Sequence, residues 1–144
     1  FSISPPQELQ RRVTALCLAA RDLLAERRRD GVSLLCAQAM ETIEKQYMEE
    51  DLSLSGVSEQ LHVSPNYLSA NMKKHAGDTF MNLLIKKRME VAHALLTTSS
   101  LKIYEVARQC GYSDQHYFSY CFKKYSGTSP VALRRARAAG EARS

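Results

Sequence analysis

Apolar residues recur at spacings of three and four positions along most of this chain, which is the spacing of one face of an α-helix. No stretch shows the strict alternation of apolar and polar residues that is typical of a β-strand. The chain is therefore predicted to be all-α. The expected helices are, in order, 7–29, 33–50, 54–61, 65–75, 80–97, 103–110, 114–126 and 130–138.

The segments between these helices carry residues that stop or start helices. Asp30-Gly31 is expected to break the chain between the first two helices. Gly111 is expected to supply a tight turn, because glycine reaches positive φ at little steric cost, and Gly127 to end a helix. Side chains that can accept a backbone N–H precede five of the helices, and the expected N-caps are Ser33, Ser64, Thr79, Ser113 and Ser129.

One part of the pattern occurs twice. The segment that begins at Val57 matches the segment that begins at Val106, at an offset of 49. One additional residue in the second copy raises the offset to 50, so that Lys73-Lys74 corresponds to Lys123-Lys124. Two copies indicate a duplicated module rather than a solenoid. Each copy is a helix, a turn and a second helix with a basic end, which is the pattern of a helix-turn-helix.

The residues of the second copy are specific enough to resemble a known family. From Ile103 to Arg134 the chain follows the pattern IxxVAxxCGYxxxxYFxxxFKKxxGxSPxxxR, and the preceding helix reads GDTFMNLLIKKRMEVAHALL, with Arg88 inside it. Over about 52–134 the sequence resembles the C-terminal DNA-binding domain of the AraC/XylS family of bacterial transcription regulators.

The resemblance implies two helix-turn-helix units joined by a long linker helix, here preceded by an N-terminal connector helix. Residues 1–6 are expected to be extended, because two prolines disfavour a helix before them. The expected divisions are a connector over 1–32, a DNA-binding domain over 33–138 (unit one 33–78, linker helix 79–98, unit two 101–138) and a frayed end over 139–144.

The charge distribution agrees with a nucleic-acid partner. The chain has a formal net charge of +5, of which residues 1–50 contribute −1 and residues 51–144 contribute +6. The basic excess therefore lies on the duplicated region, where a DNA-binding surface requires it. By itself, this excess fits an ordinary solvated basic face equally well.

The outward positions of the two recognition helices are the expected readers of DNA bases. A recognition helix enters the major groove with its N-terminal exposed residues toward the base edges, and asparagine and glutamine can bond adenine at two points. The apolar residues Leu68, Met72, Phe118, Cys121 and Phe122 are expected to face the core. The expected base-reading residues, supported by the family resemblance, are Asn66, Ser69, Ala70, Gln115, His116 and Tyr120.

Phosphate contacts are expected from the helix starts and the basic helix ends. The expected residues are Ser64, Lys73, Lys74, Thr79, Ser119, Lys123 and Lys124. The family often has arginine where this chain has Ala70 and Tyr120. Because arginine to guanine is the commonest specific contact, Ala70 predicts weaker base discrimination by unit one. Arg88 is expected to bond acidic side chains between the units rather than DNA.

No cofactor, metal site or enzymatic activity is predicted. The four cysteines, Cys17, Cys36, Cys110 and Cys121, form no CxxC pair, and the histidines are not spaced to complete a metal site with them. Free buried thiols of a reducing compartment explain the cysteines better. This type of domain also occurs fused to a DNA-repair methyl-transfer module with a reactive cysteine, but no nucleophile–base pair is recognisable here.

The first helix carries a possible self-association seam. Leu9, Val13, Leu16, Ala20 and Leu23 follow the heptad spacing of a coiled coil. This helix either dimerises and connects to an upstream domain, or packs on the DNA-binding domain, or is the frayed end of a sensor.

The chain begins without methionine and is expected to be a fragment whose regulatory part, a receiver domain of a two-component system or a ligand sensor, is missing. We expect a bacterial cytoplasmic transcription regulator, an activator, that reads two successive major grooves of double-stranded DNA. RNA polymerase and a second copy of the chain are further candidate partners. The alternative is a protein-interaction module with degenerate DNA binding. No apolar run reaches the roughly 20 residues of a membrane span.

Overall fold

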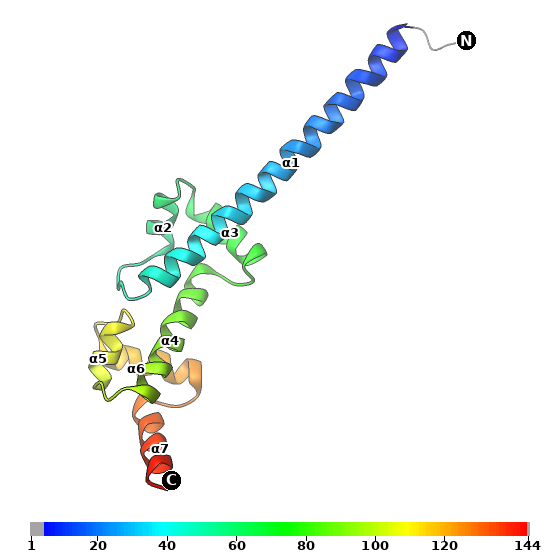
Figure 1. The fold of residues 1–144 in the computed structure, drawn as a ribbon. Helices are drawn as coiled ribbons and strands as arrows, with labels where there is room; N and C mark the ends of the chain where they lie inside the picture. Colours follow the sequence, from blue (N-terminus) through cyan, green and yellow to red (C-terminus); the bar gives the residue numbers. More distant parts are fainter. Residues whose placement is uncertain (1–4, 144) are drawn as a thin grey trace. The chain divides into compact units, whose positions relative to one another are not determined.

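The computed structural model describes residues 5–143, and every regular element among them is a helix, as the sequence predicts (Figure 1). The chain divides into two compact units, one up to Leu35 and one from Cys36 onward. The helices are α1 (Pro5–Gln46), α2 (Leu54–Gln60), α3 (Pro65–His75), α4 (Phe80–Thr98), α5 (Ile103–Gln109), α6 (Gln115–Ser126) and α7 (Pro130–Arg143).

Helix α1 corrects three expectations about the N-terminal part of the chain. The helix already includes Pro5 and Pro6, where an extended segment was expected, and Phe1–Ser4 lie outside the described residues. It continues through Asp30-Gly31, so the predicted break and the predicted cap at Ser33 are wrong. A glycine inside a helix costs only about 1 kcal/mol, which the good helix formers on both sides offset. The helix ends at Gln46, four residues before the predicted end at Glu50.

The unit up to Leu35 consists of the first part of α1. Every residue from Gln7 to Gly31 is exposed, including the leucines of the predicted heptad seam. Among the described residues, no helix is long and apolar enough to cross a membrane.

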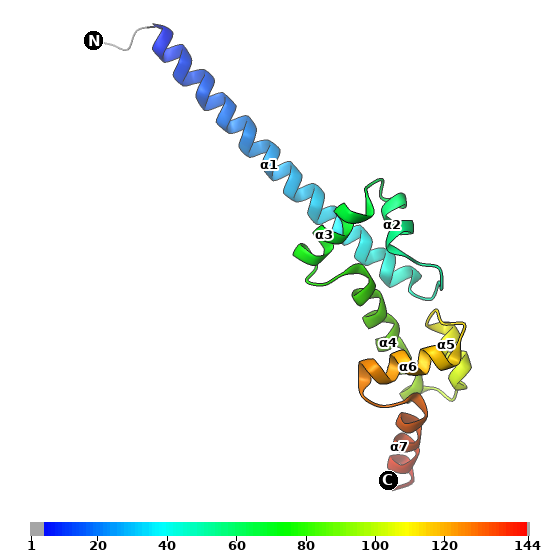
Figure 2. The same ribbon diagram turned by 180° about the vertical axis from the view of Figure 1, so that it is seen from behind.

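The compact part of the chain from Cys36 onward contains both helix-turn-helix units. Its main helix contacts join α2 to α3, α3 to α4, α5 to α6 and α4 to each of α5, α6 and α7. Figure 2 shows α4 running from the α2–α3 pair to the α5–α6 pair. The last turns of α1 are tied to α4 by an ion pair in which Lys87 Nζ lies 2.7 Å from Glu44 Oε2. The linker helix predicted from the sequence therefore joins the two units.

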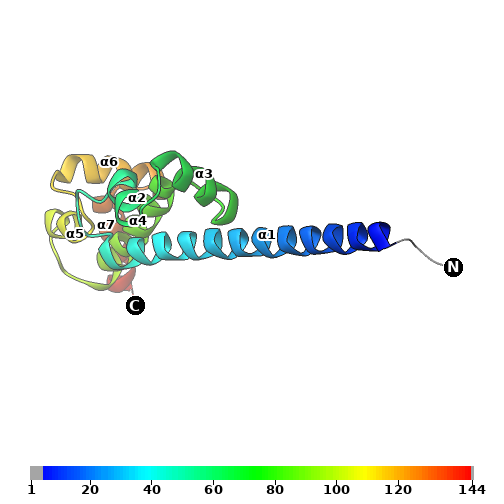
Figure 3. The same cartoon turned by 90° about the horizontal axis from the view of Figure 1, so that it is seen from above.

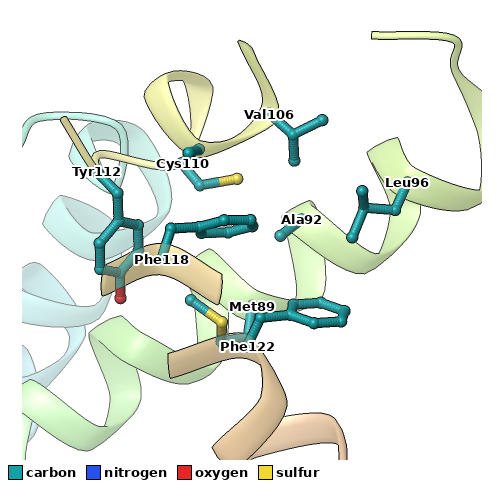
Figure 4. Close-up of a cluster of buried hydrophobic side chains, with 9 residues drawn as sticks. Met89, Ala92, Leu96, Val106, Cys110, Tyr112, Phe118 and Phe122 are labelled. Atoms are coloured by element: carbon teal, nitrogen blue, oxygen red, sulfur yellow. The ribbon is translucent and has the colours of Figure 1, made fainter. Parts of the chain in front are cut away.

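Unit two has a hydrophobic core of its own. Side chains from α4, α5, the turn after α5 and α6 converge there (Figure 4). The rings of Phe118 and Phe122 are fully buried, and the Phe118 ring centroid lies 5.6 Å from that of Tyr112. Burial of large aromatic side chains contributes roughly 2–3 kcal/mol each, so these two residues fix α6 on α4.

The predicted helix caps are correct for α3 and α4 and differ for α6. Ser64 Oγ accepts the N–H of Tyr67 at 3.1 Å, and Thr79 Oγ1 accepts that of Asn82 at 3.2 Å, as expected for N-caps. At α6, Asp114 is the N-cap, and its carboxylate accepts the N–H groups of His116 and Tyr117. Ser113, the predicted cap, instead donates its hydroxyl to Glu50 Oε1 at 2.5 Å. A carboxylate also suits the positive end of the helix dipole, which favours Asp114 over Ser113.

The C-terminal helix is longer than predicted. Helix α7 continues to Arg143, whereas fraying was expected from position 139, and Ser144 lies outside the described residues. Arg134 and Arg137 on α7 donate hydrogen bonds to the carbonyl oxygens of Leu96 and Ser99, and Arg134 also to that of Leu101. Because these carbonyls lie at and after the end of α4, the two arginines satisfy groups that the helix itself leaves unpaired.

Replacing His62 by glycine is expected to stabilise the protein by about 0.5–1 kcal/mol. His62 occupies the turn between α2 and α3 with φ of 59°, at the position that Gly111 occupies in unit two. A left-handed conformation strains a residue with a Cβ, and glycine removes that strain, less the entropy it gains on unfolding. Urea unfolding followed by circular dichroism measures the change. Ala70→Gly, at an exposed position inside α3, is the control and should destabilise by about 1 kcal/mol. A destabilised His62→Gly would contradict this explanation of the turn.

Candidate nucleic-acid interface

The second helix of each helix-turn-helix lies on the same side of the unit from Cys36 onward. Seen from above, α3 and α6 run along one edge of this unit, and the last turns of α1 run along the opposite edge (Figure 3). Each of the two helices begins at an N-cap and carries two lysines in its last turn, so the positive side chains gather at the same end of both helices. One chain therefore presents two helices that can act together on one ligand.

Helix α3 is fixed by two buried residues and turns its polar face outward. Leu68 and Met72 are fully buried, as predicted. Asn66 and Ala70 are exposed, and Ser69 is half-buried. All three predicted base-reading residues of unit one thus lie on the part of α3 that the core leaves uncovered.

Helix α6 has the same arrangement with larger side chains. Gln115 and His116 occupy its first turn and are exposed, and Tyr120 is 63% exposed. Ser119 and Cys121 are half-buried, and Cys121 packs against the core of unit two, as predicted. The three predicted base-reading residues of unit two are therefore accessible to a ligand along one face of α6.

The predicted phosphate-contacting residues flank these faces. The four lysines Lys73, Lys74, Lys123 and Lys124 are exposed in the last turns of α3 and α6. Among the described residues, the ion pairs that the structure shows include none of these four lysines. The hydroxyl oxygens of Ser64 and Thr79 accept backbone N–H groups, and each hydroxyl hydrogen remains able to donate to an anion.

Two exposed tyrosines of α6 were not predicted as site residues. Tyr117 and Tyr125 are 57% and 47% exposed. Tyr67, the counterpart of Tyr117 in the repeat, is 47% exposed. The repeat itself was the signal, because two exposed tyrosines at matching positions next to the helix starts can both donate to phosphate.

Arg88 has a role that the sequence did not predict. Its side chain is 6% exposed and donates to the backbone carbonyls of Tyr47, at 2.8 Å, and Glu49, at 2.7 Å. The predicted acidic partners are therefore wrong: the acceptors are main-chain oxygens. The guanidinium also lies over the ring of Tyr112, 5.3 Å from its centroid, a cation–π arrangement.

The chemistry of the cysteines does not indicate a nucleophile. Burial raises the pKa of Cys110 to about 11, so its thiol is protonated near neutral pH. Burial likewise raises the pKa of the Cys36 thiol. Among residues 5–143, no three potential ligands gather to hold a metal ion.

Comparison with known proteins assigns this architecture to a family. Residues 57–136 match the family described as helix-turn-helix domain. The C-terminal domain of AraT, a response regulator from Geobacillus stearothermophilus, superposes with a TM-score of 0.70 at 46% identity, over 72% of this chain and 85% of that one. The chain belongs to the AraC/XylS family and is a DNA-binding domain of a transcription regulator. This family consists of DNA-binding regulators rather than enzymes.

Two further relatives give the range of the similarity. The transcriptional activator RhaS of Salmonella arizonae is 32% identical over 122 residues, which are 85% of this chain and 43% of RhaS. The DNA-binding domain of AdpA, a global transcriptional factor solved in complex with a target DNA, is 24% identical with a TM-score of 0.65, over 78% of this chain and 97% of that one. That second likeness shows the fold alone. The chain spans about half or less of the length of the curated relatives it matches.

Proposed function

We propose that this chain reads a non-palindromic DNA site as a single copy, with α3 and α6 in two successive major grooves. The observation that supports it most strongly is the placement of two capped, lysine-ended helices on one side of one unit. A recognition helix fits the major groove, and successive major grooves on one face of B-DNA lie about 34 Å apart. If the helices are closer than this, bending the DNA costs of order 1–6 kcal/mol.

We assign base reading to the exposed faces of the two helices and phosphate contacts to their flanks. Asn66 and Gln115 are suited to bond adenine at two points, and Ser69, Ala70, His116 and Tyr120 lie beside them. Ser64, Thr79 and Ser119, together with the four lysines, would hold the backbone and so fix the register. Ala70 offers no hydrogen bond, so unit one should discriminate between bases less strongly than unit two.

Selection of binding sites from a random pool of double-stranded DNA, at two salt concentrations, tests this function. The expected result is a motif of two blocks about ten base pairs apart, with weaker base preferences in the block read by α3. Recovery of a single block would overturn the assignment of both helices as readers. Salt-sensitive binding without any motif would instead support the alternative, a protein-interaction module whose DNA binding is degenerate. None of the relatives named above supports that alternative.

The whole protein is proposed to be a bacterial cytoplasmic activator, controlled by a domain outside this chain. The chain spans only part of the length of its curated relatives, and AraT, which it resembles at 46% identity, is a response regulator. A receiver domain is therefore favoured over a ligand sensor. RNA polymerase is the second partner that an activator of this kind would contact.

The exposed seam of α1 is proposed to pair with a second copy of the chain. Leu9, Val13, Leu16 and Leu23 are each more than half exposed and repeat at heptad spacing. Leu16→Glu should shift sedimentation equilibrium from dimer to monomer, because a charge in the seam would be buried unpaired. Leu18→Glu is the matched control: Leu18 is 53% exposed on the same helix but lies outside the seam. A monomer in both variants and in the parent chain would contradict the pairing.

A further inference from the structure

The two helix-turn-helix units meet at one buried guanidinium. Arg88 projects from α4, the helix that both units share. On one side it donates to the carbonyls of Tyr47 and Glu49, in the loop of unit one between α1 and α2. On the other side it lies over Tyr112, in the turn of the second unit. A single side chain thus contacts both units and the linker.

Beside Arg88, the turn of unit two packs tightly against the loop of unit one. Gly111 has φ of 87°, and a Cβ added there would lie 2.8 Å from the Tyr47 carbonyl oxygen and 3.0 Å from Arg88 Nε. Only glycine therefore allows the turn of unit two to approach the loop of unit one this closely. Next to Gly111, Ser113 donates to Glu50 Oε1 at 2.5 Å, a hydrogen bond that joins the turn directly to the loop. Figures 1 and 2 show this loop, between α1 and α2, beside the turn between α5 and α6.

The contact also reaches recognition helix α6. The Tyr112 ring that receives the guanidinium packs against Phe118, with centroids 5.6 Å apart, and against Tyr117, at 5.9 Å. Phe118 and Tyr117 both belong to α6. A displacement of Arg88 would therefore change the packing of α6, the helix that is proposed to read DNA.

We propose that Arg88, Gly111, Tyr112 and the Ser113–Glu50 pair form a clasp that fixes the separation and angle of α3 and α6. The clasp sets the number of base pairs between the two blocks of the DNA site. If α4 were the only connection, one unit could rotate about the axis of that helix relative to the other unit. The clasp is a contact away from this axis, and it therefore opposes the rotation. This inference rests on the proposed function for its consequence on DNA, but the clasp itself is a property of the free protein.

The first test measures the free protein and needs no DNA. Spin labels are placed at Lys74 and Lys124, which are exposed and occupy matching positions of the repeat, in a Cys17→Ser, Cys121→Ala background. Pulsed electron–electron double resonance should give one narrow distribution of the distance between the two labels. Arg88→Met, which keeps an unbranched apolar stem but cannot donate a hydrogen bond, should broaden the distribution. Arg88→Lys, with one ammonium for two carbonyls, should give an intermediate width.

Arg134→Met is the matched control for that test. Arg134 also donates its guanidinium to several backbone carbonyls, but these belong to the end of α4 and the segment that follows it. Its loss should lower stability without broadening the distribution. If Arg88→Met does not fold, Ser113→Ala removes the outer bond of the clasp in a folded protein and should also broaden the distribution. An unchanged width in the folded Arg88 and Ser113 variants overturns the clasp.

The second test measures DNA binding against spacer length. The selected two-block site is lengthened or shortened by two base pairs. The parent chain should lose at least about tenfold in affinity, because one recognition helix then faces the wrong base pairs, and Arg88→Met should lose less than about threefold. Broadened distances with unchanged spacer discrimination would overturn the role of the clasp in site spacing. Failure of the parent chain to bind any two-block site counts against the proposed function and leaves the distance result standing.

Discussion

Gly111→Ala is expected to lower the free energy of unfolding by about 2–5 kcal/mol. A left-handed backbone conformation costs a residue with a Cβ about 1–2 kcal/mol, and crowding a packed region costs about 1–3 kcal/mol more. The crowding is severe here, because the new Cβ would lie 2.8 Å from a backbone carbonyl, that of Tyr47, which cannot rotate away. Urea unfolding followed by circular dichroism measures the loss.

Gly127→Ala separates the two contributions. Gly127 has φ of 83°, close to the 87° of Gly111, but a Cβ added there meets no atom within 4 Å. This variant should therefore lose only the backbone contribution of about 1–2 kcal/mol. Equal losses in Gly111→Ala and Gly127→Ala would show that the turn of unit two does not approach the Tyr47 loop as closely as the structure places it.

Replacing Lys73, Lys74, Lys123 and Lys124 together by alanine is expected to reduce DNA affinity roughly a thousandfold at about 0.1 M salt. Each phosphate contact contributes about 0.9 to the slope of log affinity against log salt, so four contacts contribute about 3.6. All four side chains are exposed, so the fold should not change. Fluorescence anisotropy with a labelled duplex over a series of salt concentrations gives both the affinity and the slope.

The control for the lysine variant removes the same charge from another place. Arg11, Arg21, Arg27 and Arg28 are exposed on α1, and replacing them by alanine also lowers the formal net charge from +5 to +1. If the lysines contact phosphates, only the lysine variant should show the shallower salt slope. Equal losses in the two variants would indicate a general effect of net charge and would remove the lysines from the proposed interface.

The sequence by itself determined most of the helix-turn-helix units. Apolar spacing placed the buried residues Leu68, Met72, Phe118 and Phe122 correctly, because the helical period determines which residues share a face. The repeat predicted a duplicated unit and, with it, a recognition helix in each copy. The exposure of Asn66, Gln115 and Tyr120 followed from the same periodicity.

Only the tertiary structure decided the features that depend on residues far apart in the chain. Local rules predicted a cap at Ser113, but the Ser113 hydroxyl bonds Glu50, 63 positions away. The partners of Arg88 are backbone carbonyls, which are present at every residue and therefore leave no mark in the sequence. Gly111 was predicted as a turn from its type, but the need for glycine there comes from the Tyr47 carbonyl beside it. Periodicity fixes what one helix buries, whereas the position of one unit against another depends on contacts that only the folded chain brings together.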